Sequence, residues 1–144
     1  AKITVVDGAM SAACNLVLFG GPGSNSVMAR VIKRLPVEWT REAMRVSGKS
    51  YDPDSHGLSM IYPNPLNPRR YVVINSGHTF HEPDFKNSNS WLFPRLGDIA
   101  VQSFSKTASG GYDETISWAG FFDSHWQFEK PKPAAGKSKG EAGD

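Results

Sequence analysis

Short apolar runs separated by turn residues recur along the chain, and the first clear one is Leu16-Val17-Leu18-Phe19. It is followed by Gly20-Gly21-Pro22-Gly23, so the pattern predicts a buried strand that ends in a tight turn. The next apolar side chains recur at helical spacing: Val27, Met28, Val31, Ile32 and Leu35. We therefore predict a helix after the turn, with Ser24 as its N-cap and Pro36 as its end.

Further short strands are predicted over 37–40, 44–46, 58–62, 71–75, 99–104 and 112–122, with a helix over 80–92. Three prolines exclude a helix from 63–70, and the strands on either side can pair antiparallel across that stiff loop. Gly110-Gly111 predicts the hairpin turn before the last strand. Because a strand, a glycine turn and a helix open an α/β unit, we predict a single three-layer α/β domain with a mixed sheet over residues 1–128.

The last segment differs in composition from the rest of the chain. Residues 129–144 read EKPKPAAGKSKGEAGD and contain no aromatic side chain and no Leu, Ile, Val or Met. Such a segment cannot bury enough surface to offset its ordering entropy, so we predict a disordered polar tail.

The charges are nearly balanced over the 144 residues, with 16 Lys and Arg against 14 Asp and Glu. A nucleic-acid platform needs a concentrated basic face, so no nucleic-acid partner is expected. No apolar run approaches the roughly 20 residues that span a bilayer, so no membrane span is expected either. Cys14 is the single cysteine and, as a small side chain beside an apolar strand, is expected in the core.

The glycine turn is the first candidate ligand site. Backbone amides between a strand and a helix start, together with the positive end of the helix dipole, can hold a phosphate or a carboxylate. The candidate ligand-binding residues are Gly21, Gly23, Ser24 and Asn25. GGPGSN matches neither a Walker loop nor GxGxxG, and the alternative is that the glycines serve only the tight turn.

The densest polar cluster follows the strand predicted over 71–75 and reads Ser76-Gly77-His78-Thr79-Phe80-His81-Glu82-Pro83-Asp84. In open α/β sheets, ligands bind at the carboxyl ends of strands. His78, His81 and Glu82 are candidate catalytic residues in acid/base roles, and Ser76 is a candidate ligand-binding residue. His78, His81 and Asp84 are candidate ligands for a divalent metal, the one cofactor the sequence suggests. The alternative is that these side chains brace the loop and cap a helix.

No nucleophile motif of the GxSxG type is present. Four tryptophans stand in this small domain, at Trp39, Trp91, Trp118 and Trp126. Most are expected in the core, and one or two on a rim would be able to stack on a sugar ring.

Several longer series carry a resemblance to a known family: NLVLFGGPGSN (15–25), IYPNPLNPRRYVVINSGHTFHEPDF (61–85), WLFPRLGDIAV (91–101) and FFDSHW (121–126). The chain resembles the C-terminal part of large bacterial proteins described as prolyl-oligopeptidase-like or dienelactone-hydrolase-like, in the α/β-hydrolase group. In that family the nucleophile elbow belongs to the upstream part, and no triad motif matches this chain. The resemblance implies a hydrolase context and a secreted or envelope location.

Three functions follow as hypotheses. The first is an accessory or C-terminal domain that packs on a catalytic hydrolase domain or presents a crevice for a small molecule, a peptide or a glycan. The second is a stand-alone hydrolase, peptidase-like or esterase-like, that uses His78, His81, Glu82 and Asp84, with or without a metal. The third is a carbohydrate-binding module with exposed tryptophans. The absence of a nucleophile motif favours the first over the second.

Overall fold

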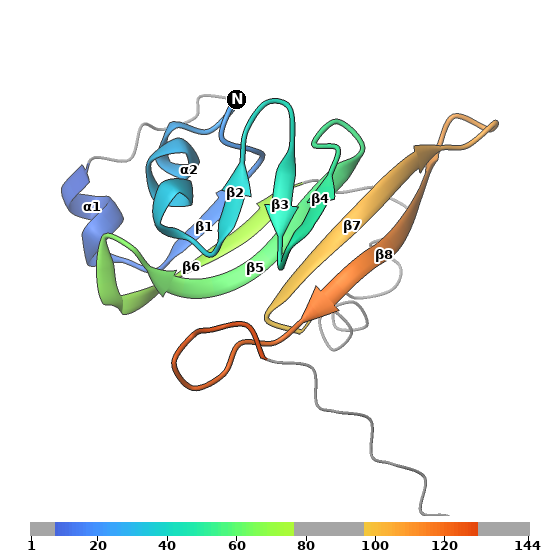
Figure 1. Cartoon of the computed structure of the whole chain (residues 1–144). Helices are drawn as coiled ribbons and strands as arrows, with labels where there is room; N and C mark the ends of the chain where they lie inside the picture. The colour runs from blue at the N-terminus through green and yellow to red at the C-terminus, as the bar shows by residue number, and fades with distance from the viewer. Residues whose placement is uncertain (1–7, 77–96, 130–144) are drawn as a thin grey trace, which may run out of the picture.

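The computed structural model describes residues 8–76 and 97–129 and contains two β-sheets (Figure 1). The larger sheet has five strands in the order β1-β6-β5-β7-β8, and the smaller has three in the order β2-β3-β4. The strands are β1 Leu16–Phe19, β2 Val37–Trp39, β3 Met44–Val46, β4 Lys49–Tyr51, β5 His56–Asn64, β6 Asn67–Ser76, β7 Ile99–Lys106 and β8 Tyr112–Gly120. The helical elements are α1 Gly8–Ala13, α2 Ser26–Val31 and the 3₁₀ turn η1 Ile32–Arg34.

This architecture corrects the predicted fold class. The described part of the chain is mostly β, with two short α-helices, and it is not a three-layer α/β domain. The helix predicted up to Leu35 has only six α-helical residues before it tightens into η1. The segments that follow fold into the three-stranded sheet instead of a covering helix. The helix predicted over 80–92 lies outside the described residues.

The mixed pairing of the large sheet centres on β6. On one side β6 pairs in parallel with β1, and on the other it pairs antiparallel with β5. β5 then pairs antiparallel with β7, and β7 with β8. The parallel pair places Phe19 opposite Asn75, so the carboxyl ends of β1 and β6 lie at the same end of the sheet. The strand–GGPGSN–helix unit therefore exists, as an addition to a largely antiparallel sheet.

The hairpin of β5 and β6 confirms the predicted antiparallel pairing, but its loop is much shorter than expected. Pro63 still lies opposite Tyr71, whereas the next residue, Asn64, lies opposite Asn67, so the ladder is irregular where the prolines occur. Proline has no N–H to donate, and an irregular ladder tolerates it. Asn64 Nδ2 donates to the carbonyl oxygen of Ser11 at 2.9 Å, which attaches α1 to the hairpin.

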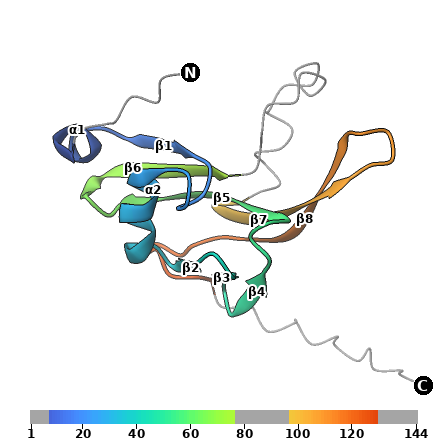
Figure 2. The ribbon, with the colours of Figure 1, turned by 90° about the horizontal axis from the view of Figure 1, so that it is seen from above.

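The hydrophobic core lies between the two sheets, and β2–β4 lie to one side of the five-stranded sheet (Figure 2). Because side chains alternate along a strand, only one face of β1 and β6 contributes to this core. A single cluster joins the large sheet, α2 and the small sheet through the fully buried side chains of Met28, Val31, Met44, Leu58, Val72, Ile99 and Val101. Phe122, in the segment after β8, also belongs to this cluster.

The hairpin of β7 and β8 turns where the sequence predicted. Gly110 has φ +87°, and its N–H donates to the carbonyl oxygen of Thr107 at 3.0 Å. The Gly110-Gly111 turn is thus confirmed, and glycine is required because the left-handed region is open to it without a steric penalty.

Candidate functional site

The glycine turn between β1 and α2 is held by hydrogen bonds within the chain. The N–H groups of Ser24 and Asn25 both donate to the carbonyl oxygen of Gly21 at 3.1 Å, and the Ser24 hydroxyl reaches the same oxygen at 3.2 Å. Gly20 has φ +79°, so it is the residue that needs the left-handed conformation. Gly21 and Gly23 do not take a positive φ.

The N-cap of α2 is Asn25, not the predicted Ser24. Asn25 Oδ1 accepts from the N–H groups of Val27 and Met28, both at 3.0 Å, and its Nδ2 donates to the carbonyl oxygen of Phe19, also at 3.0 Å. One side chain thus joins the start of the helix to the end of β1. Asparagine suits this position because its acceptor oxygen and its donor nitrogen are separate atoms, so one side chain can bond to groups on two sides of it.

These bonds bear on the anion-binding hypothesis for Gly21, Gly23, Ser24 and Asn25. The amides of Ser24, Asn25, Val27 and Met28 are all bonded within the chain. An anion at the turn would have to compete with these partners, and α2 has only six residues to supply a dipole. Anion binding at this turn stays a prediction.

Gly21 has a different physical role. A Cβ atom placed on Gly21 would lie 3.2 Å from the ring of Trp39, at the end of β2. The absence of a side chain therefore lets the turn pack directly on the tryptophan ring. Gly23 has no atom within 4 Å of the corresponding position.

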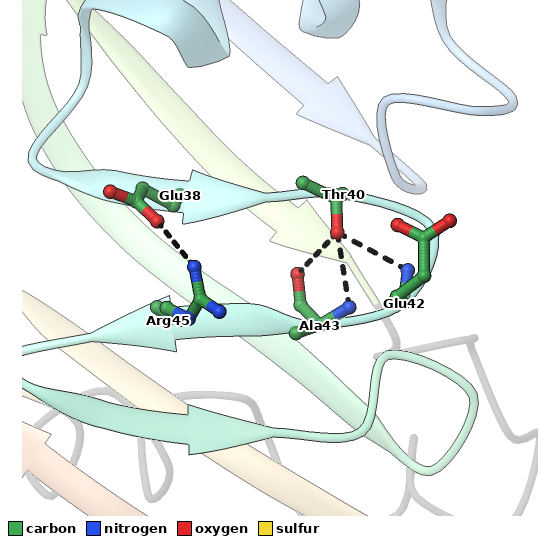
Figure 3. Close-up of polar contacts among 5 residues, drawn as sticks. All are labelled: Glu38, Thr40, Glu42, Ala43 and Arg45. Carbon is green, nitrogen blue, oxygen red and sulfur yellow. Dashed lines mark hydrogen bonds and ion pairs between the residues drawn. The ribbon is translucent and has the colours of Figure 1, made fainter.

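Beyond Trp39, the turn between β2 and β3 is closed by the side chain of Thr40 (Figure 3). Thr40 Oγ1 accepts from the N–H groups of Glu42 at 3.2 Å and Ala43 at 3.1 Å. Across the same hairpin, Arg45 forms an ion pair with Glu38 at 3.1 Å. Both charged side chains are more than 60% exposed, so this pair contributes little to the free energy of folding.

Ser76 lies at the carboxyl end of β6. Because β1 and β6 are parallel, Ser76 and the glycine turn that follows β1 lie at the same end of the sheet. Its hydroxyl accepts from the N–H of Leu58 at 2.8 Å and donates to the carbonyl oxygen of Leu58 at 3.2 Å. Ser76 is 4% exposed, so its hydroxyl bridges β6 to β5 inside the protein. Beside it, the buried Oδ1 of Asn75 has no hydrogen-bond partner among the described residues.

His78, His81, Glu82 and Asp84 lie outside the described residues, as does Trp91. Within residues 8–76 and 97–129, no three His, Cys, Asp or Glu side chains gather in a way that could hold a metal ion. The catalytic and metal hypotheses for the His78–Asp84 segment stay predictions.

Sequence reasoning missed the exposed side of β1. The apolar run was expected to be fully buried, but Leu16 and Leu18 are buried while Val17 is 59% and Phe19 is 51% exposed. The reason is topological, because the core packs on one face of the five-stranded sheet and alternate side chains of β1 point to the other face. A four-residue apolar run has no alternation that would reveal this. Cys14, just before β1, is likewise exposed and not in the core.

The segment after β8 forms a compact loop around Asp123. Asp123 Oδ1 accepts from the N–H groups of His125 at 2.8 Å and Gln127 at 2.9 Å, and these two bonds lower the pKa of the Asp123 carboxyl below its usual 3.8. Trp126 takes φ +60°, a conformation that costs a residue with a side chain about 1–3 kcal/mol. The Tyr62 hydroxyl donates to the carbonyl oxygen of Trp126 at 3.2 Å.

The Trp126 ring packs among other aromatic side chains. Its centroid lies 5.5 Å from that of Tyr62, 5.9 Å from that of Tyr71 and 6.1 Å from that of Phe122. Trp39, Trp118 and Trp126 are all partly buried against the core, so the described tryptophans act first as packing residues. Tyr71 is the most exposed ring of this group, at 46%.

Comparison of the chain with protein-family models, with curated proteins and with solved structures gives no match. The resemblance to hydrolase C-terminal parts therefore stays a prediction. No helix in the described part of the chain is long and apolar enough to cross a membrane.

Proposed function

We propose that this chain is an accessory domain that packs on the catalytic domain of a hydrolase. The observation that carries the proposal is the exposed pair Val17 and Phe19, which are alternate residues on one face of the edge strand β1. The sequence resemblance to hydrolase C-terminal parts supplies the kind of partner.

Burial of this pair provides a driving force for docking. Full burial of a Val or Phe side chain contributes about 1.5–3 kcal/mol. Both side chains are already about half shielded from solvent, so docking would add roughly half of this free energy for each of them. Such a small surface suits a domain attached to its partner, because attachment raises the effective concentration of the docking surface.

The second candidate function is a stand-alone hydrolase, and one observation favours it. Because β1 and β6 are parallel, the glycine turn and Ser76 both lie at the carboxyl ends of these strands. Ligands of open sheets bind at the carboxyl ends of strands. The residues that follow Ser76 in the sequence contain the candidate acid/base pair His78 and His81.

An activity screen of the purified chain separates the two functions. We expect no hydrolysis above the blank on p-nitrophenyl esters and on chromogenic peptides, with or without EDTA. Hydrolysis that falls more than about tenfold in both His78→Ala and His81→Ala would overturn the accessory role and establish the hydrolase. The matched control is His125→Ala, in the exposed loop after β8, which should leave any activity unchanged.

A further inference from the structure

The two edges of the five-stranded sheet differ in how well they are protected against pairing with another strand. β8, at one edge, carries Asp113 and Glu114, and its ladder with β7 contains a register shift. Charged side chains and irregular ladders are the usual protection of an edge. β1, at the other edge, has the sequence LVLF, so its four-residue length is its one protection, and it has no charge, proline or bulge. No strand of the described residues pairs with its outer side.

The elements around the open edge carry charge of one sign. α1, β1, α2, η1 and β6 together contain no Asp or Glu, and their basic residues, all exposed, are Arg30, Lys33, Arg34, Arg69 and Arg70. Arg69 and Arg70 precede the part of β6 that pairs with β1, and Arg30 lies in the helix that follows β1. These five elements therefore carry a net positive charge, which favours an acidic partner over a basic one.

We propose that β1 accepts an added strand from its partner, and that this strand is apolar on alternate residues and flanked by acidic residues. The inference rests on the proposed function, for which it supplies the mode of docking and the chemistry of the partner. The added strand pairs its backbone with the outer side of β1, as in other cases of strand addition. Its apolar side chains on one face then cover Val17 and Phe19, and its acidic ends meet the basic residues nearby.

A second copy of this chain fits the edge less well. Pairing β1 with β1 of another copy would bring the same basic residues together, and like charges oppose that contact. The acidic edge β8 of another copy has the right charge but is protected by its charged residues and its register shift.

Synthetic peptides test the proposal directly. The probe is a labelled peptide of alternating Val and Thr with two Glu at each end, and its binding to the purified chain is followed by fluorescence anisotropy. The first comparison peptide has Lys in place of each Glu, and the second has a central Pro that prevents strand pairing. We expect the acidic peptide to bind at least about tenfold more tightly than either comparison peptide, equivalent to about 1.4 kcal/mol.

Variants of the protein locate the binding. The double variant Val17→Thr/Phe19→Thr keeps β-forming residues at exposed positions but removes the apolar contact, and Ile116→Thr is the matched control on the opposite edge. We expect the double variant to lose at least about tenfold in affinity while Ile116→Thr binds as the unaltered chain does. Circular dichroism of both variants confirms that the sheet is intact.

Three results would overturn the inference: no binding of the acidic peptide, equal binding of all three peptides, or equal binding by the double variant. A dimer in sedimentation that the double variant abolishes would also overturn it, because a second copy would then occupy the edge. The activity screen is independent of these outcomes. A chain that hydrolyses esters and still binds the acidic peptide through β1 loses the accessory role but keeps the strand-accepting edge.

Discussion

At the scale of single residues, the turn after β1 shows how two glycines in sequence have different tasks. Gly20 supplies a positive φ, whereas Gly21 makes room for the ring of Trp39. The composition GGPG predicts that a tight turn exists, but it does not predict which glycine has which task. That division depends on where α2 and β2 pack, which is information from distant parts of the chain.

The first prediction concerns Gly20. A Cβ atom there would lie 2.6 Å from the hydroxyl of Ser24, at a φ of +79°. We expect Gly20→Ala to lower the free energy of unfolding by about 1–3 kcal/mol, measured by urea denaturation. Gly23→Ala, where nothing lies within 4 Å, is the control and should change stability by less than about 0.5 kcal/mol. Equal effects of the two substitutions would contradict the assignment of the strained position to Gly20.

The second prediction concerns the carboxyl of Asp123 and acid pH. Its pKa is lowered, chiefly by the backbone N–H groups of Gln127 and His125. A carboxyl with a lowered pKa in the folded state stabilises that state above its unfolded pKa, and this contribution is lost as pH falls through the folded pKa. We expect the difference in Tm between the unaltered chain and Asp123→Ser to shrink as pH falls below the ordinary value of 3.8.

Serine is the informative replacement at that position because its oxygen still accepts hydrogen bonds but does not titrate near acid pH. A difference in Tm that stays constant from neutral to acid pH would show that the Asp123 charge plays no part in holding the loop.

At the scale of elements, the sequence predicted most strands because their short apolar runs are bounded by Gly, Pro and Asn. The strands expected at 44–46, 58–62, 71–75 and 99–104 all lie within observed strands. The helix after the glycine turn was predicted too long, because apolar spacing alone does not show where an α-helix tightens into a 3₁₀ turn. The edge position of β1 depends on the order of the strands, and the exposure of Val17 and Phe19 depends on which face of the sheet the core covers. The four residues of β1 indicate neither feature.

The third prediction concerns the start of α2. Asn25 satisfies two amides of the helix and also bonds to the end of β1, so Asn25→Ala removes an N-cap and a tether at once. We expect a loss of about 0.5–2 kcal/mol in the free energy of unfolding, measured by thermal or urea denaturation. Ser24→Ala is the comparison, and it should cost less because the Ser24 hydroxyl bonds only to the carbonyl oxygen of Gly21. A larger loss for Ser24→Ala would restore the predicted Ser24 cap.

At the scale of the whole molecule, the layer arrangement was the least predictable feature. The prediction of an α/β fold rested on the unit from β1 to α2, and β1 lies at one edge of the sheet. The core is closed by a second, small sheet and by the segment around Phe122, which are joined to the large sheet through contacts distant in sequence. The place of the candidate site could be predicted because ligands of open sheets bind at the carboxyl ends of strands. The last residue of β1 and Ser76 of β6 do lie at the same end of the sheet.

The separation of charge also emerges only at this scale. Basic residues accompany β1 and β6, whereas Asp113, Glu114, Asp123 and Glu129 lie in β8 and the segment after it. The net charge of +2 conceals this difference between the two edges. Together with the unprotected strand β1, it makes one side of the molecule suited to an acidic partner.

Amide hydrogen exchange of the isolated chain, read residue by residue by NMR, tests the central claim that β1 is an open edge. Alternate residues of a strand point their N–H groups to opposite sides. We therefore expect alternate amides in Leu16–Phe19 to exchange nearly as fast as unstructured amides, while Leu58 and Met60 in the middle of the sheet are strongly protected. Protection of all four β1 amides as strong as that in β5 would show that the outer side of β1 is already paired, which would contradict the account.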